Sequence, residues 1–404
     1  MLEAGAAGSG ERNNGDEPIM SLEYVAPDEL DESRLDDQSV LSGGSADEML
    51  RAVAGAGAQV REAAANTAEA RLHTLAEEGR PRALVVAGVG TAARVGEALA
   101  AVAGSRCTVP VLSHRSAGIP GWVGAADVVI AVSASGHGPE ALAAAEAAMH
   151  RGARLVAVGA PDSPLQAIAE RARATFVPVP LRRPARVSFW GLAVPVLMTG
   201  RALGLVSVTE ADLAETAARL DADAQRCRAT QDSVVNAGKT LAIDLAGMIP
   251  VIWGSSRLAA VASTRFSEQL AANAHYPAMS GSLVEASRAR VGLLDGLFGA
   301  KAAAPDDIFA DRVDTEHKVR IRLVLLRDEG ESAIGIHRAG AVAELAGERG
   351  IGVSTLTSEG MSPLERLASL IAVPDFASVY LAVLHGVDPI AVPAVSDLKD
   401  RMTP

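Results

Sequence analysis

The sequence predicts an α/β protein with two tandem, doubly wound parallel-sheet domains. Short, continuous apolar runs alternate with helical segments, which is typical of a parallel sheet covered by helices on both faces. The pattern also repeats: "ALVVAGVGTAARVGEALA", from Ala83, and "IPVIWGSSRLAAVASTRF", from Ile249, both read as an apolar strand, a glycine, small residues and a helix. The length of 404 residues exceeds what one hydrophobic core usually serves.

The first 45 residues differ from the rest of the chain in composition. Residues 1–45 are rich in Gly, Asp, Glu, Ser and Asn and show little apolar periodicity, so we expect a flexible acidic arm. A helix is predicted from Ala46 to Glu78, because Met49 and Val53 are available for one apolar face. This helix opens the first sheet domain, which we place at residues 46–232.

Five apolar runs predict the strands of this first domain. Each run is short and continuous, and helical segments separate the runs, so the strands should lie parallel. Pro139 stands where a first helical residue is favoured, and Gly152 stands where that helix should stop. Ser163 and Pro164 open the next helix. The predicted strands are 83–87, 108–112, 127–132, 154–158 and 175–179.

The pattern restarts in residues 233–404, which we predict to form the second sheet domain. Strands are expected to begin at Ile249, Lys318 and Gly352, with a helix between the last two. Residues 297–317 read as an excursion or a flexible loop. The tail, residues 363–402, is predicted to be helical throughout.

Charge and composition argue against several classes of function. A net charge of −12 and a pI near 5.2 disfavour nucleic-acid binding through the overall field of the protein. The N-terminus lacks the pattern of a signal peptide, and the most apolar segment, 189–200, is too short to cross a membrane. Cys107 and Cys227 fit no metal or redox spacing. We therefore expect a cytoplasmic protein that carries no metal or other cofactor.

The stretch "SASG", Ser133 to Gly136, follows a predicted strand and precedes a predicted helix. In an open parallel sheet, ligands bind beyond the carboxyl ends of the strands, and a helix N-terminus offers free N–H groups to an anion. Ser133 and Ser135 would add two hydroxyls to such a site. A second glycine turn, with Gly88, Gly90 and Thr91, follows another strand of the same sheet. Together the two turns predict a phosphate site.

The same turns admit other interpretations. Serines at this place also cap helices without binding any ligand. A nucleophilic serine would need the pattern Gly-x-Ser-x-Gly, which is missing here. Neither the phosphate loop that ends in Gly-Lys-Ser/Thr nor a dinucleotide fingerprint is present. His137 stands in the turn and is expected to be an exposed loop residue, and no histidine pair has helical metal spacing.

Most of residues 46–404 resemble the bifunctional phosphoglucose/phosphomannose isomerases, which consist of two sugar-isomerase (SIS) domains. "VAGVGTAARVG" is similar to the first glycine turn of that family, and "VSASGHGPEAL" is similar to its Ser-x-Ser-Gly-Asn-Thr phosphate loop. The most specific match is the tail "DFASVYLAVLHGVDPIAVPAVSDLKDRM", which resembles the closing pattern Ser-x-Tyr-Leu-Ala, Gly-Val-Asp-Pro and Leu-Lys. The resemblance implies a hexose phosphate or a related phosphosugar as the ligand, and a homodimer.

The chemistry that the resemblance implies is aldose–ketose isomerisation of a hexose 6-phosphate. That reaction needs a base to move a proton between C1 and C2, an acid/base group to open the ring, and positive charge for the enediolate. Ala272 stands where the family carries its glutamate base, and Arg288 stands where it carries its histidine. Arg186 matches the arginine that stabilises the enediolate, and Lys399 matches a lysine near the site.

Three hypotheses for the function follow from these replacements. Alanine cannot transfer a proton, so the first is a phosphosugar-binding protein with weak or no isomerase activity. The second is an active glucose-6-phosphate/mannose-6-phosphate isomerase in which His275 and Glu285, close in sequence to the vacant positions, supply the catalytic groups. Both residues also have simple non-catalytic interpretations: His275 as a surface loop residue and Glu285 as a carboxylate on a helix face. The third hypothesis is a scaffold protein that binds no ligand.

Overall fold

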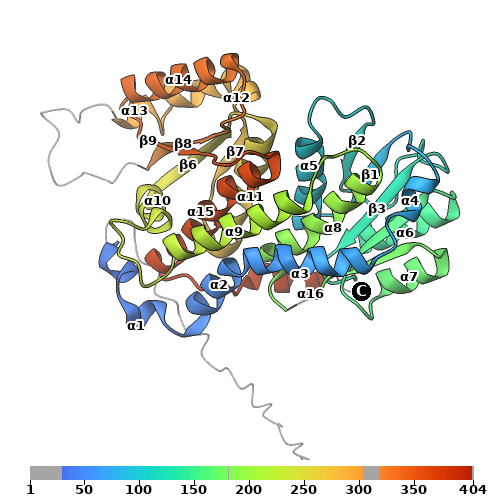
Figure 1. The fold of residues 1–404 in the computed structure, drawn as a ribbon. Helices are drawn as coiled ribbons and strands as arrows, with labels where there is room; N and C mark the ends of the chain where they lie inside the picture. The colour runs from blue at the N-terminus through green and yellow to red at the C-terminus, as the bar shows by residue number, and fades with distance from the viewer. Residues whose placement is uncertain (1–29, 181, 304–318, 403–404) are drawn as a thin grey trace, which may run out of the picture.

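The computed structural model describes residues 30–180, 182–303 and 319–402, and it contains two parallel sheets with helices on both faces (Figure 1). The first sheet has the strand order β2-β1-β3-β4-β5 and the second has the order β7-β6-β8-β9. The predicted fold class is confirmed. The strands of the first sheet are β1 (Leu84–Ala87), β2 (Val111–His114), β3 (Val128–Ser133), β4 (Arg154–Gly159) and β5 (Thr175–Pro178). Those of the second are β6 (Met248–Gly254), β7 (Met279–Ser282), β8 (Arg320–Arg327) and β9 (Val353–Thr357).

The strands bury both of their faces, since side chains alternate along them. In β1, Leu84 and Val86 face the core between the two sheets, while Val85 and Ala87 face the outer helices. The outer helices are α6 (Pro139–His150) and α7 (Pro164–Ala172) on the first sheet and α12 (Leu283–Ala289) and α14 (Ala333–Glu348) on the second. Burial on both faces explains why these strands are continuous apolar runs in the sequence.

The inner faces of the two sheets share one continuous core. Several helices contribute to this core: α3 (Ala56–Glu69), α5 (Thr91–Ala103), α8 (Phe189–Ala202), α9 (Glu210–Arg226), α10 (Ala237–Leu245), α11 (Arg257–Asn273) and α15 (Pro363–Leu384). The domain boundary that we place near residue 232 falls between α9 and α10. The two sheets are thus joined by packing as well as by the chain.

Helix α15 is the only helix among the described residues that is long and apolar enough to cross a membrane. Its most apolar window is 89% buried inside the protein. A helix that is apolar all round is stable in water only where neighbours cover every face. Here α9, α10 and α11 pack against it, so it serves as the central helix of the shared core.

Part of the predicted flexible arm is packed. Residues 1–29 lie outside the described residues, but residues 30–45 contain the short helices η2 (Glu32–Leu35) and α1 (Gln38–Leu41) and the start of α2 (Gly44–Ala54). Leu35 and Leu41 are fully buried in the shared core. Asp36 also receives a hydrogen bond of 3.0 Å from the buried Nζ of Lys239. Two leucines and one ion pair thus attach residues 30–45 to the core, although the composition of this segment predicts flexibility.

Two predicted helices are interrupted. The helix expected over 46–78 is divided into α2, α3 and the short α4 (Thr74–Glu77), with breaks at Gly55 and at residues 70–73. The tail is divided into α15 and α16 (Pro393–Met402) by a turn that contains Gly386 at a φ of +63°. Only residues 297–303 of the predicted excursion at 297–317 are described, and they include the short α13 (Ala300–Ala303).

Candidate functional site

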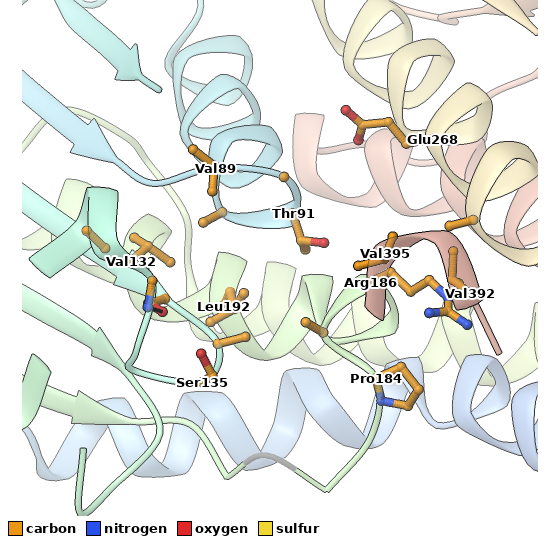
Figure 2. Close-up of a pocket in the computed structure, with 18 of the residues that line it drawn as sticks. Val89, Thr91, Val132, Ser135, Pro184, Arg186, Leu192, Glu268, Val392 and Val395 are labelled. Atoms are coloured by element: carbon orange, nitrogen blue, oxygen red, sulfur yellow. Dashed lines mark hydrogen bonds between the residues drawn. The ribbon is translucent and has the colours of Figure 1, made fainter. Parts of the chain in front are cut away.

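A cavity of about 890 Å³ lies at the carboxyl ends of β1 and β3. The strand order reverses between these two strands, and such switch points are where open α/β sheets bind ligands. The volume falls in the ordinary range for small-molecule sites. Its walls come from both halves of the chain: the start of α5, the turn before α6, the short helix η3 (Ala185–Val187), α11 and α16 (Figure 2).

Ser133 and Ser135 both line this cavity. The Oγ of the buried Ser133 accepts a hydrogen bond of 3.1 Å from the Gly138 N–H, and the Oγ of the exposed Ser135 accepts one of 3.2 Å from the His137 N–H. These bonds use the hydroxyl oxygens as acceptors, so each O–H can still donate to an anion. Helix α6 starts directly after the turn, at Pro139, so the positive end of its dipole faces the cavity. The turn therefore combines capping bonds with donors for a phosphate.

The three glycines predicted to bind the ligand have different roles. Gly90 lines the cavity and has a φ of +58°, which favours glycine at the start of α5. Gly88 and Gly136 are not among the lining residues. A Cβ on Gly88 would lie 2.6 Å from the Val132 carbonyl oxygen, and one on Gly136 would lie 2.1 Å from the Ser163 Oγ. These two glycines shape the turns by allowing close packing.

Arg186 lines the cavity and connects distant parts of the chain. Its Nε donates to the Asn273 Oδ1 at 2.7 Å, and its Nη2 donates to the carbonyl oxygens of Pro389 and Ile390 at 2.5 and 3.0 Å. Burial lowers the pKa of Arg186, against the attraction of Asp388. These bonds hold the turn before α16, whose residues Val392, Val395 and Ser396 form part of the cavity wall. Arg186 therefore places this wall as well as positive charge at the site.

Glu268 is a cavity residue that sequence reasoning missed. It lies on α11, four residues before Ala272, so both side chains project from the same face of the helix. Its Oε1 is 3.3 Å from the Nε of the buried Arg94. Burial raises the pKa of Glu268 more than the nearby arginines 94, 265 and 115 lower it. The sequence contained a signal for this residue: a glutamate four residues before Ala272 on the same predicted helix lies on the same helix face.

The two residues expected to replace the missing catalytic groups are not among those that line the cavity. His275 lies beyond the end of α11, with a φ of +51°, and its Nε2 is 3.1 Å from the carbonyl oxygen of Ala391. Glu285 lies in the first turn of α12, on the outer side of the second sheet. His275 therefore lies beside the turn before α16, whose residues Ile390 and Val392 line the cavity, whereas α12 places Glu285 on the far side of the second sheet.

The other predicted residues are placed as follows. Thr91 lines the cavity at the first residue of α5. Ala272 also lines it, together with Ala271. Lys399 belongs to α16, three residues after the lining residue Ser396. The His137 ring is exposed, with Nδ1 2.8 Å from the Ser135 carbonyl oxygen, as expected for a loop residue.

The corresponding switch point of the second sheet carries a buried carboxylate of the protein. Asp328 follows β8 and is only 4% exposed. Its N–H donates to the Ser255 Oγ at 2.9 Å, and its Oδ1 accepts from the Arg366 Nε at 2.8 Å and from the Gly330 N–H at 3.0 Å. An internal carboxylate thus takes up two donors at this switch point, the Arg366 Nε and the Gly330 N–H.

The arrangement of acidic, histidine and cysteine side chains offers no metal centre in the described part of the chain. Across residues 30–180, 182–303 and 319–402, no group of three or more His, Cys, Asp or Glu side chains is arranged to hold a metal ion. The charged side chains that line the cavity are Glu140, Arg186 and Glu268.

Two parallel sheets with a shared core, and a cavity between two glycine turns at a switch point, define a class: proteins with the fold of paired SIS domains. Solved structures confirm the fold. A protein of Thermus thermophilus superimposes with a TM-score of 0.63 at 17% identity, covering 92% of this chain and 94% of that one. The C-terminal domain of glucosamine-fructose-6-phosphate aminotransferase from Francisella tularensis superimposes with a TM-score of 0.60 at 12% identity, covering 85% of this chain and 97% of that one.

Sequence comparison identifies more specific relatives within this class. Residues 234–402 match the family described as the bacterial phospho-glucose isomerase C-terminal SIS domain. A bifunctional phosphoglucose/phosphomannose isomerase of Caldicellulosiruptor bescii is 26% identical over 323 residues, which is 79% of this chain and 89% of that protein. The chain is thus similar to the SIS phosphosugar isomerases, and the resemblance found in its sequence is confirmed.

Proposed function

We propose that the protein binds a hexose phosphate or a related phosphosugar in this cavity and has weak or no aldose–ketose isomerase activity. One observation carries the proposal: Thr91, Ser133 and Ser135 line the same cavity as Ala272. The hydroxyls and the start of α6 supply donors for a phosphate. At the position where the resemblance places the catalytic base, the wall carries only a methyl group. The named relative, a phosphoglucose/phosphomannose isomerase, supports a sugar phosphate as the ligand.

The charged side chains of the cavity add little electrostatic attraction for a bound anion. Glu140 lies in the first turn of α6, where its carboxylate competes with a bound anion for the helix dipole. Arg186 already donates three hydrogen bonds to the protein. A phosphate would therefore be held mainly by hydroxyls and backbone N–H groups, and its affinity should depend strongly on the two serines.

We predict that replacing both serines weakens binding of sugar phosphates. A hydrogen bond to a charged group contributes about 1.5–3 kcal/mol, so Ser133→Ala with Ser135→Ala should reduce affinity by at least about tenfold. The measurement is a thermal-shift titration of the full chain with glucose 6-phosphate, fructose 6-phosphate and glucosamine 6-phosphate. Ser105→Ala, beyond the far end of α5, is the matched control.

The same titration separates the competing hypotheses. If no sugar phosphate raises the melting temperature of the wild-type protein, the scaffold without a ligand is the better interpretation. If the double variant binds as tightly as the wild type, the phosphate lies elsewhere. Robust isomerase activity in a coupled assay would favour the active enzyme with relocated groups.

The resemblance also supports a homodimer in the cytoplasm, which we propose as the working assembly. In the resembled family the active site is completed across a dimer, and such assemblies usually have closed twofold symmetry. Light scattering at micromolar concentration should give twice the chain mass of 41.4 kDa. A monomer at that concentration would count against the dimer.

A further inference from the structure

We propose that Glu268 is the acid/base residue of this cavity and transfers a proton between C1 and C2 of a bound hexose 6-phosphate. The inference rests on the proposed function, because it requires a sugar phosphate in the cavity. It replaces His275 and Glu285, the candidates that sequence proximity suggests, with a residue that lines the cavity itself.

The geometry of α11 supports this assignment. Residues 268, 271 and 272 all line the cavity, and two of them are alanines, so the Glu268 carboxylate has open space toward the ligand. Its side chain is 44% exposed. Figure 2 shows Glu268 on α11, across the cavity from Ser135. In a hexose 6-phosphate the reacting carbons C1 and C2 are at the opposite end of the chain from the phosphate. A phosphate at the serine turn therefore directs C1 and C2 away from that turn, toward the other walls of the cavity.

The electrostatic surroundings position the carboxylate and suit it to proton transfer. Arg94 is buried and pairs with both Glu97 and Glu268, so its guanidinium limits where the Glu268 carboxylate can lie. The raised pKa of Glu268, caused by burial, brings the group closer to the range in which a carboxylate acts as both base and acid. We assign Arg94 as a positioning residue for Glu268.

The proposed step needs no co-reactant. The Glu268 carboxylate takes the proton from C2 of the open-chain aldose, and the electron pair of the C2–H bond forms the C1=C2 bond as charge moves to O1. The proton of the C2 hydroxyl moves to O1. Protonated Glu268 then returns its proton to C1, while the C1=C2 pair forms the new C1–H bond and O2 becomes the carbonyl oxygen. Arg186, beside the cavity, offers positive charge to the intermediate.

Glu140 is the rival carboxylate, since it also lines the cavity. It lies in the first turn of α6, directly after the serine turn, so it would face the phosphate end of the ligand. Glu268 projects from an element of the other half of the chain. This separation favours Glu268 for chemistry at C1 and C2.

The test is the exchange of sugar protons with solvent. The full-length protein is incubated with fructose 6-phosphate in D₂O, and loss of the C1 proton signal is followed by NMR, which detects proton transfer even where net turnover is small. We expect slow exchange with the wild type and at least about a 10²-fold loss in Glu268→Gln, since a general base is typically worth 10²–10⁴ in rate. Glu344→Gln, an exposed glutamate on α14, should exchange as the wild type does.

A second variant and a pH profile separate catalysis from structure. Glu268→Asp keeps the charge toward Arg94 but withdraws the carboxylate by one methylene, so it should fold, bind and lose most of the exchange. In the wild type, exchange should rise with pH through a pKa above the ordinary glutamate value, and this rise should be absent in Glu268→Gln.

The outcomes distinguish this inference from the function on which it rests. If thermal shifts show binding but the wild type exchanges no proton, or Glu268→Gln exchanges at the wild-type rate, the inference is overturned and the binding function stands. Loss of exchange in Glu140→Gln alone would move the role to that residue. If no sugar phosphate binds, both the function and the inference fail.

Discussion

Placing a glutamate at residue 272 should raise the rate of fructose 6-phosphate isomerisation above the slow rate that Glu268 supports, since a well-positioned general base contributes about 10²–10⁴-fold. Ala272 lines the cavity on α11, so a longer side chain there would project into the ligand space without displacing core residues. The resemblance places the base of the family at this position. The measurement is a coupled assay that compares Ala272→Glu with the wild type.

The neighbouring alanine provides the control. Ala271→Glu adds the same carboxylate to the same cavity, but from a position about 100° around the helix. It should raise the rate far less if the geometry of residue 272 is what matters. Ala272→Glu also adds a like charge four residues from Glu268, which costs only about 0.2–0.5 kcal/mol of helix stability. Equal activity in the two variants, or no gain in either, would show that residue 272 does not occupy the position of the family's base.

Removing Asp375 should cost about 3–5 kcal/mol of the free energy of unfolding, because it leaves a buried arginine without its counter-charge. Asp375, on α15, accepts from the Arg265 Nε at 3.1 Å and from its Nη2 at 2.6 Å. Arg265 is 3% exposed, and its guanidinium lies 4.9 Å from the centre of the Phe189 ring. Because the pair is buried, Arg265 without Asp375 would hold a poorly solvated charge, and this lowers the free energy of unfolding.

Urea unfolding of Asp375→Ala would measure this cost, with Asp397→Asn, an exposed aspartate on α16, as the control. The double variant Arg265→Met with Asp375→Leu should recover much of the loss, because an apolar pair of similar volume removes both charges together. Arg265 also donates to the carbonyl oxygen of Arg186 at 3.2 Å, so Asp375→Ala should weaken ligand binding as well. A loss below about 1 kcal/mol would mean that solvent reaches the pair.

The central strands of both sheets were predictable because each is buried on two faces. Such a strand must be a continuous apolar run, as in "ALVVA" and "DVVIAV". Edge strands lack this requirement. The edge strand β7, Met279–Ser282, has the sequence MSGS and was not predicted, and β2 is displaced to Val111–His114 from the expected 108–112.

The serine and glycine turns of the candidate site were predictable for a related reason. Each directly follows a strand, and the carboxyl ends of parallel strands meet at one edge of the sheet. Local order along the chain therefore brings Thr91 and Ser133 to one cavity. Ala272 could be added only through the resemblance to a known family.

The sequence by itself determined the fold class, the two repeats and the turns that offer hydroxyls to an anion, because these depend on local periodicity and on order along the chain. Only the tertiary structure decided which titratable side chains reach the cavity. Glu268 enters it and Glu285 does not, because the two lie on opposite sides of the second sheet. It also brought Asp328 to Ser255 and Arg366 at the switch point of the second sheet, across separations of 73 and 38 residues. Contacts between such distant residues arise from packing, which no local pattern contains.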